Sequence, residues 1–264
     1  MEKCHSGCGR EKNMAQGIIK VVGTGPGGLD HLTPAAEKAL RTADVVIGYR
    51  TYLDLIADLL PGKEVITSSM MQEVDRCTKA FELAESGRCV VMVSGGDPGI
   101  YAMAGLIYEI AVEKDSKIPI EVIPGLAAVN SCAARLGAPL MHDFATISLS
   151  DLLTPWEVIE KRLHAAASAD FVIALYNPKS KKRTEHIKQA REIIMQHRDG
   201  NTPVGIVSGA MREDEVITLT DLSTMLDADI NMQSTVIIGN STTFTWHGQM
   251  ITPRGYKDKY TLES

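Results

Sequence analysis

Residues 18–42 have the sequence IIKVVGTGPGGLDHLTPAAEKALRT, and this stretch decides the fold. The apolar run Ile18–Val22 predicts a buried strand, and the glycine loop Gly23–Gly28 follows it directly. Thr33 can cap a helix over Pro34–Thr42, because proline fits the first turn of a helix. A strand, a glycine loop and a helix in this order indicate one unit of a parallel α/β sheet.

The alternation of strand and helix continues through the first half of the chain. Short apolar runs predict further strands over Val45–Gly48, Val65–Thr67, Cys89–Ser94 and Ile120–Ile123. Amphipathic segments between them predict helices over Tyr49–Leu59, Gln72–Glu85, Ala102–Glu113 and Gly125–Leu136. Strands that alternate with helices are joined by right-handed crossovers, so we expect a mainly parallel sheet.

The pattern changes where Gly137-Ala138-Pro139 interrupts it, and we place a domain boundary near residue 140. Beyond it the sequence predicts strands over Ala145–Leu149, Phe171–Tyr176, Val204–Ser208, Val216–Thr220 and Thr235–Ile238, and helices over Trp156–Ala167, Thr184–His197 and Leu222–Leu226. The last three strands are close in sequence, which favours hairpins and a mixed sheet. The predicted fold class is α/β, with an N-terminal tail (1–16), an N-terminal domain with glycine loops (17–140), a C-terminal domain (141–252) and a C-terminal tail (253–264).

Composition narrows the class of protein. The chain has 264 residues, with 27 Lys and Arg against 33 Asp and Glu and a net charge of −6, so we expect no nucleic-acid partner. No apolar run reaches about 18 residues, which argues against a membrane partner. The polar start Met1–Gln16 lacks the apolar core of a signal peptide. The 5 cysteines favour free thiols in a reducing cytoplasm.

A possible metal cluster lies near the start of the chain. Cys4, His5 and Cys8 offer three ligands, whereas a closed zinc site takes four. We therefore expect a disordered tail at this position and no bound metal.

Two glycine loops follow strands of the predicted parallel sheet. Gly23–Gly28 matches the dinucleotide fingerprint G-x-G-x-x-G, but the helix begins only at Pro34 and no acidic residue ends the second strand. The second loop is Ser94–Gly99, and its Asp97 can either bind a ligand or close an Asx turn. Ligands of open α/β sheets bind beyond the carboxyl ends of strands, so the two loops predict a ligand site. A plain tight turn and nicotinamide or flavin binding are the alternatives for the first loop.

Five motifs, in this order, resemble the tetrapyrrole methylases, which are class III S-adenosylmethionine methyltransferases of the cobalamin and sirohaem pathways. They are GTGPGG (23–28), SGGDPGIY (94–101), PGLAA (124–128), ALYNP (174–178) and STVIIGN (234–240). Two further stretches, GYRTYLDLI (48–56) and HDFATISLSDLLTPWEVIEKRL (142–163), are similar to the branch that methylates C17 of precorrin-3B or cobalt-factor III. The resemblance implies two α/β domains with a cleft between them and a homodimer. It also implies the methyl donor S-adenosyl-L-methionine, which leaves as S-adenosyl-L-homocysteine.

The resemblance also implies site residues. Contacts to the cofactor would come from Pro26, Gly96, Asp97, Ile100, Ala127, Ala128, Tyr176, Asn177, Ala210, Met211 and Thr235, with core packing as the alternative for Ala210 and Met211. The tetrapyrrole substrate carries many carboxylates, so basic side chains should surround it. The expected substrate-binding residues are Arg50, Tyr49, Ser148 and Arg212. The basic run Lys179–Arg183 either joins them or forms a solvated face.

In this branch the resemblance implies that methylation is coupled to contraction of the macrocycle, a step that needs a proton transfer. The candidate catalytic residues are His142, Asp143 and Asp151, since His142-Asp143 lies at the predicted domain junction. Helix capping by Ser150-Asp151 and a plain interface role for His142 are the alternatives. The sequence leaves open whether the substrate contains cobalt, and whether C11 or C20 is methylated instead. A nicotinamide-dependent oxidoreductase and an inactive tetrapyrrole-binding protein are the competing classes.

Overall fold

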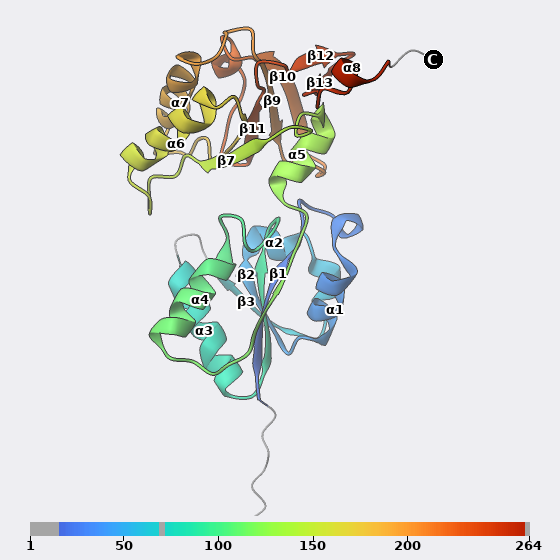
Figure 1. The fold of residues 1–264 in the computed structure, drawn as a ribbon. Coiled ribbons are helices and arrows are strands. Elements are labelled where there is room, and N and C mark those ends of the chain that lie inside the picture. Colours follow the sequence, from blue (N-terminus) through green and yellow to red (C-terminus); the bar gives the residue numbers. More distant parts are fainter. Residues whose placement is uncertain (1–15, 69–71, 262–264) are drawn as a thin grey trace, which may run out of the picture.

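The structure is a computed structural model that describes residues 16–68 and 72–261. It consists of two lobes, each built on a five-stranded sheet (Figure 1). The segment with Cys4, His5 and Cys8, on which the metal expectation depends, lies outside the described residues. Among the described residues, no helix is both long and apolar enough to cross a membrane.

The first sheet is parallel throughout and has the strand order β3-β2-β4-β1-β5. Its strands are β1 (Ile18–Gly23), β2 (Val45–Tyr49), β3 (Glu64–Ser68), β4 (Cys89–Ser94) and β5 (Ile120–Ile123). The parallel pairing confirms the prediction from the strand–helix alternation. Because the strands are parallel, the loops after β1, β2, β4 and β5 leave the sheet at one edge.

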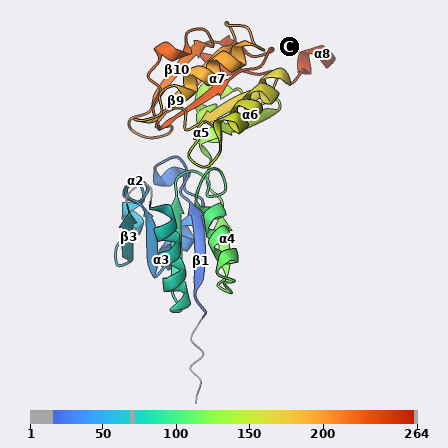
Figure 2. The ribbon, with the colours of Figure 1, turned by 90° about the vertical axis from the view of Figure 1, so that its left-hand side faces the viewer.

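Helices cover both faces of this sheet (Figures 1 and 2). One face is covered by α3 (Glu73–Glu85) and α4 (Met103–Glu113). The other face is covered by α1 (Pro34–Thr42), α2 (Arg50–Asp54) and the short 3-10 helix η2 (Ala57–Leu59). A second 3-10 helix, η1 (Leu29–His31), precedes α1. α1 begins as predicted, because the Thr33 hydroxyl accepts a hydrogen bond from the Ala36 N–H at 3.1 Å.

The helix predicted over Tyr49–Leu59 is divided into α2 and η2. Leu53, Ile56 and Leu59 are all buried in the same core. Their spacing of three residues suits the tighter 3-10 turn, which places residues i and i+3 above one another. Tertiary packing therefore changes the type of helix at this position.

The second sheet is mixed, as predicted, and has the strand order β10-β9-β11-β8-β7. Its strands are β7 (Phe144–Ser148), β8 (Val172–Tyr176), β9 (Pro203–Ser208), β10 (Val216–Asp221) and β11 (Ser234–Ile238). β7 and β8 are parallel, whereas β11 is antiparallel to both β8 and β9. α6 (Trp156–Ser168) and α7 (His186–Met195) pack on one face of this sheet, and the short 3-10 helix η3 (Met225–Asp227) adds Met225 to the same core.

α5 (Ala128–Leu136) covers the opposite face of the second sheet, where Figures 1 and 2 show it against the upper lobe. Its residues Cys132 and Leu136 are buried with Val207 of β9 in one cluster. Gly205 makes this contact possible, because a Cβ there would lie 2.3 Å from the Leu136 side chain. The chain therefore passes from the first sheet to the second after β5. The predicted boundary near residue 140 assigned α5 to the first domain, whereas its packing assigns it to the second.

A small third sheet completes the second lobe. It joins β6 (Gly137–Ala138) to the hairpin of β12 (Phe244–Trp246) and β13 (Gln249–Ile251), in the order β12-β13-β6. Within the predicted C-terminal tail the structure has a short helix, α8 (Tyr256–Lys259). None of these elements was predicted, because each is too short to show an apolar periodicity.

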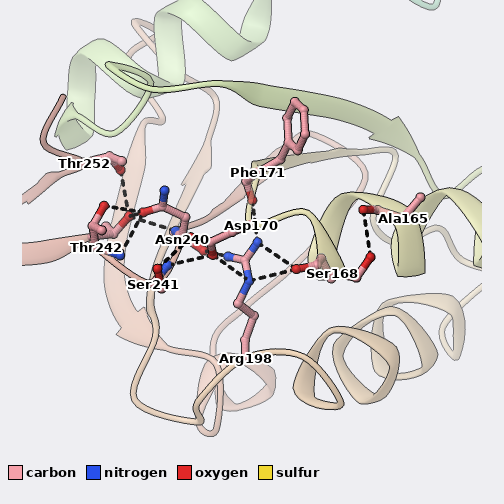
Figure 3. Close-up of polar contacts among 12 residues, drawn as sticks. Ala165, Ser168, Asp170, Phe171, Arg198, Asn240, Ser241, Thr242 and Thr252 are labelled. Carbon is pink, nitrogen blue, oxygen red and sulfur yellow. Dashed lines mark hydrogen bonds and ion pairs between the residues drawn. The ribbon is translucent and has the colours of Figure 1, made fainter. Parts of the chain in front are cut away.

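A buried arginine ties the amino end of β8 to the carboxyl end of β11 (Figure 3). The Arg198 side chain is 2% exposed and donates hydrogen bonds to the carbonyl oxygens of Gly239 and, at 2.7 Å, of Phe171. Its Nε lies 3.4 Å from Asp170 Oδ1. Burial lowers the pKa of Arg198, and the Asp170 carboxylate offsets part of this. This network closes the end of the second sheet that lies opposite to Tyr176.

Candidate active site

Three loops of the first lobe meet through their backbones. Gly25 and Gly96 exchange two hydrogen bonds, from Gly25 N–H to the Gly96 carbonyl at 3.1 Å and in the reverse direction at 2.8 Å. Both residues have positive φ, of 72° and 66°, which favours glycine. A Cβ on Gly125 would lie 2.2 Å from the Gly96 carbonyl oxygen and 2.9 Å from Gly23 Cα. The glycines thus allow the loops after β1, β4 and β5 to pack in backbone contact.

Asp97 joins two of these loops. One carboxylate oxygen accepts the Gly99 N–H at 2.8 Å, which closes an Asx turn, and the other accepts the Gly125 N–H at 3.1 Å. Of the two alternatives for Asp97, the geometry therefore shows the brace. Its backbone remains at the surface where the three loops meet.

The first turn of α5 faces the same loops. A Cβ on Gly96 would be in van der Waals contact with the start of α5, with Ala128 N at 3.7 Å as the nearest atom. The Val129 N–H donates to the Tyr176 hydroxyl at 2.8 Å, and α5 has no side-chain cap. Burial raises the pKa of Tyr176 to about 12, so the hydroxyl remains neutral. The helix end is thus held by a neutral acceptor, and of its first-turn donors the Ala128 N–H has no partner among the described residues.

Two residues of the second lobe adopt left-handed backbone at this place. Asn177 has φ of 50° and follows β8, and Met211 has φ of 61° in the loop between β9 and β10. The Met211 N–H donates to Glu215 at 2.6 Å, and Arg135 pairs with the same carboxylate at 2.7 Å. Partial burial alone would raise the pKa of Glu215, but these hydrogen bonds outweigh it and lower the pKa. Left-handed non-glycine residues often occur in binding loops, where the surroundings hold the strained backbone.

Side-chain hydrogen bonds connect the two lobes directly. Arg212 Nε donates to the Pro26 carbonyl at 2.6 Å, and its side chain lies against Gly27. The Tyr101 hydroxyl donates to the Thr146 carbonyl at 2.9 Å. The loops of both lobes therefore meet at a single site, which we call the interlobe site. It comprises residues 24–28, 95–102, 124–127, 176–178 and 209–215.

The residues expected to contact the cofactor lie in these loops or directly beside them. Ala127, Ala210 and Thr235 are at most 9% exposed, so their side chains belong to the floor of the site. Ile100 and Tyr176 pack against the same cluster. Ala210 thus has the core position given as its alternative role.

The residues expected to bind substrate divide into two kinds. Arg50 follows β2 at the same edge of the first sheet, is exposed, and makes no ion pair with any other described residue. Arg212 instead spans the lobes to Pro26. The Ser148 hydroxyl accepts hydrogen bonds from Asn177 Nδ2 at 3.0 Å and from the Ser150 N–H at 3.2 Å. Tyr49 packs edge-on against Tyr52, whose ring covers Gly95.

His142 and Asp143 do not lie at the interlobe site, contrary to their predicted position at the domain junction. They precede β7, whereas Ser148 ends it, and at about 3.3 Å per residue the strand separates its ends by about 13 Å. They line a hollow of about 380 Å³ together with Asp170, Asn240 and Arg254. The catalytic expectation for this pair therefore lacks the geometry it assumed.

Asp151 lies at the carboxyl end of β7, beside residues that sequence reasoning missed. His186 Nε2 is 3.5 Å from Asp151 Oδ2, and Arg183 Nη1 is 4.0 Å from Asp151 Oδ1. Trp156 stacks on His186. Helix capping, the alternative for Asp151, is absent at α6, whose N-cap is Pro155 without a side-chain bond. No spacing in the sequence links His186 to Asp151, because the two residues lie on different elements.

Comparison with known proteins places this geometry in a family. Residues 19–226 match the Tetrapyrrole (Corrin/Porphyrin) Methylases. The chain is 51% identical over 251 residues to the cobalt-factor III methyltransferase of Priestia megaterium, covering 94% of this chain and 46% of that protein. It is 46% identical over 239 residues to the probable cobalt-factor III C(17)-methyltransferase of Salmonella typhimurium, covering 90% and 99%. It thus spans about half the length of the first relative and nearly all of the second.

A solved structure agrees with these sequence relatives. The methyltransferase CobJ superposes with a TM-score of 0.84 at 36% identity, covering 90% of this chain and 100% of that chain. The two α/β lobes with glycine loops between them agree with this family. The chain belongs to the tetrapyrrole methylase family.

Proposed function

We propose that this protein transfers a methyl group from S-adenosyl-L-methionine to C17 of cobalt-factor III in cobalamin biosynthesis, with contraction of the macrocycle to cobalt-precorrin-4. The observation that carries the proposal is the 46% identity to a relative of matching length whose name gives this reaction. Precorrin-3B, its cobalt-free counterpart, is the second candidate substrate. We favour the cobalt form because both sequence relatives described above carry its name.

The interlobe site suits the methyl donor in its chemistry. The loop at Gly96 lies against the start of α5, where the Ala128 N–H has no partner among the described residues and can donate to a carboxylate. The neutral Tyr176 hydroxyl and the floor of Ala127, Ala210 and Thr235 exclude water from a flat group. A dinucleotide fits less well, since the Gly23–Gly28 loop leads into η1 and α1 begins only at Pro34.

The donor supplies an already activated methyl group, so the protein mainly orients the two reactants and excludes water. Loops held by backbone contacts and by Asp97 are rigid enough for this task. Arg50, exposed and without an ion pair in the described part of the chain, is our candidate anchor for a carboxylate of the macrocycle.

We further propose a homodimer that works in the cytoplasm. Val216 and Ile217 lie on the edge strand β10 with 58% and 42% exposure, which suits a partner surface. The described cysteines Cys77, Cys89 and Cys132 are free, as a reducing compartment requires. Sedimentation of the purified protein tests the assembly.

The direct test incubates the purified protein with S-adenosylmethionine and either cobalt-factor III or precorrin-3B. We expect one added methyl group on cobalt-factor III, located at C17 by isotope-labelled NMR. Methylation at C11 or C20, or binding of NAD without binding of S-adenosylmethionine, would contradict the proposal.

A further inference from the structure

Methylation of an uncharged ring carbon by a sulfonium leaves a proton to be removed. An electron pair of the ring carbon forms the new C–CH₃ bond, and the S–CH₃ electron pair stays on sulfur. The donor becomes neutral, so its positive charge passes to the macrocycle. That charge is relieved when one N–H, O–H or C–H bond of the macrocycle breaks and its electron pair stays behind. A fixed proton acceptor beside the macrocycle accelerates this step.

Asp151 lies directly beside the interlobe site and is a carboxylate that is both accessible and in contact with basic side chains, His186 and Arg183. Asp97 already accepts two backbone N–H groups, and Glu215 accepts from Met211 and Arg135. Asp151, in contrast, has no hydrogen bond from the backbone, and its side chain is 45% exposed. It therefore keeps lone pairs free to accept a proton.

The segment that carries Asp151 is fixed to the cofactor-side loops. The Leu149 N–H donates to the Tyr176 carbonyl at 2.9 Å. Arg183 donates to the Asn177 carbonyl at 2.7 Å and to the Ser150 hydroxyl at 3.2 Å. Asp151 is thus linked through Arg183 to Asn177, which the family resemblance places at the cofactor. This position also assigns Arg183, within the basic run 179–183, to a brace rather than to a solvated face.

His186 is oriented toward Asp151 by two contacts of its own. Its Nδ1 lies 3.1 Å from the Leu149 carbonyl oxygen, which can only accept, so Nδ1 carries a proton. The Trp156 ring stacks on it with centroids 4.5 Å apart and planes at 22°. Nε2 therefore faces the carboxylate, 3.5 Å from Oδ2, and donates to it when this second ring nitrogen also carries a proton. A histidine that is only 15% exposed and held on both sides can keep a carboxylate in one orientation.

The residues after Asp151 suit a large substrate with apolar faces. Leu152 and Leu153 are 71% and 93% exposed, although both are apolar. Such an exposed pair beside a braced carboxylate is expected where a flat macrocycle covers the loop.

We propose that Asp151 accepts the proton that the macrocycle loses on methylation, and that His186, held by Leu149 and Trp156, is the positioning residue for this carboxylate. The inference rests on the proposed function. It assigns a role to His186, Trp156 and Arg183, which the resemblance did not include.

The test uses single-turnover methyl transfer with S-adenosylmethionine and cobalt-factor III, or precorrin-3B. Asp151→Asn should lower the rate of formation of the methylated product by about 10²-fold or more, with cofactor affinity unchanged. Asp151→Glu should restore part of this rate. His186→Gln keeps an amide N–H where Nε2 lies, whereas His186→Asn keeps only the Nδ1 position. We expect His186→Asn to lose about tenfold and to shift the acid limb of the pH–rate profile, and His186→Gln to lose less.

Matched controls outside the site are Asp115→Asn, at an exposed position, and His164→Gln, at a half-buried position beside His197, and melting temperatures confirm folding. The proposal for Asp151 is overturned when folded Asp151→Asn reacts within threefold of the wild-type rate. Equal losses in both His186 variants with an unchanged pH profile would assign His186 a structural role only. If the wild-type protein methylates neither macrocycle, the proposed function fails and this inference fails with it.

Discussion

The two sides of the interlobe site differ in whether backbone or side-chain atoms form them. On the first lobe, the loops around Gly25, Gly96 and Gly125 contact each other mainly through backbone atoms, with the Asp97 carboxylate as a brace. On the second lobe, Asp151, His186 and Arg183 form a wall of polar side chains. A backbone surface binds a constant cofactor and tolerates no added atoms. A side-chain surface can be adapted to one substrate without changing the fold.

The largest effect on cofactor affinity should come from adding a side-chain atom where the glycine loops of the first lobe are in backbone contact. Gly125→Ala places a Cβ 2.2 Å from the Gly96 carbonyl oxygen, so the loops after β1, β4 and β5 must separate. We expect cofactor affinity to fall at least about 100-fold, since ligand contacts depend on loop geometry. Calorimetry with S-adenosylmethionine measures the affinity.

Gly62→Ala is the matched control for this variant. Gly62 also has positive φ, of 77°, but nothing lies within 4 Å of its Cβ position. It should lose about 1 kcal/mol of stability through backbone strain alone and keep full affinity. Equal affinity in both variants would show that the glycine contact does not shape the cofactor site.

A smaller effect should follow from removing charge at the substrate edge. Arg50→Ala should raise the substrate KM about tenfold with kcat and cofactor affinity nearly unchanged, because an anchor acts equally in ground and transition states. Steady-state kinetics at several ionic strengths check this. The control is Arg41→Ala, whose guanidinium pairs with Glu37 on the outside of α1. A tenfold fall in kcat with constant KM would assign Arg50 to chemistry instead.

The smallest effect concerns the free energy of unfolding at alkaline pH, for which a thiol in the core of each lobe can be compared. Burial raises the pKa of Cys77 to about 12 and that of Cys132 to about 11, from about 9. A raised folded pKa means that stability is complete below about pH 9 and is lost as pH rises toward the folded value. Each thiol should contribute a slope of about 1.4 kcal/mol per pH unit in its window.

Urea unfolding between pH 9 and 11 tests this slope. Cys132→Ala and Cys77→Ala should each lose less stability with rising pH than the wild-type protein. The half-buried Cys89, whose pKa is also raised, should show a weaker effect on substitution to alanine. If stability fell with pH at the same slope in all four proteins, the pKa of each thiol would be the same in the folded and unfolded states.

Sequence patterns predicted the elements that depend on local chemistry. α1 over Pro34–Thr42, β4 over Cys89–Ser94 and β5 over Ile120–Ile123 have the predicted bounds, because caps, glycines and apolar runs act within a few residues. The parallel first sheet and mixed second sheet also followed from connection length. The motif loops are likewise where the resemblance implied, since glycine spacing specifies a turn.

Long-range packing decided what the patterns did not contain. α5 lies on the second sheet because Gly205 accommodates Leu136, a pairing of residues far apart in sequence. His142 and Asp143 are adjacent in sequence to β7, but they lie at its amino end, whereas the interlobe site lies at its carboxyl end.

The sequence by itself therefore determined the two α/β lobes, their glycine loops and the family to which the chain is similar. Only the tertiary structure decided that Asp151 stands beside His186 and Arg183, which lie on a separate segment at the start of α7. Local propensities act through neighbours along the chain, whereas a side-chain constellation depends on how whole sheets and helices dock, which no short pattern encodes.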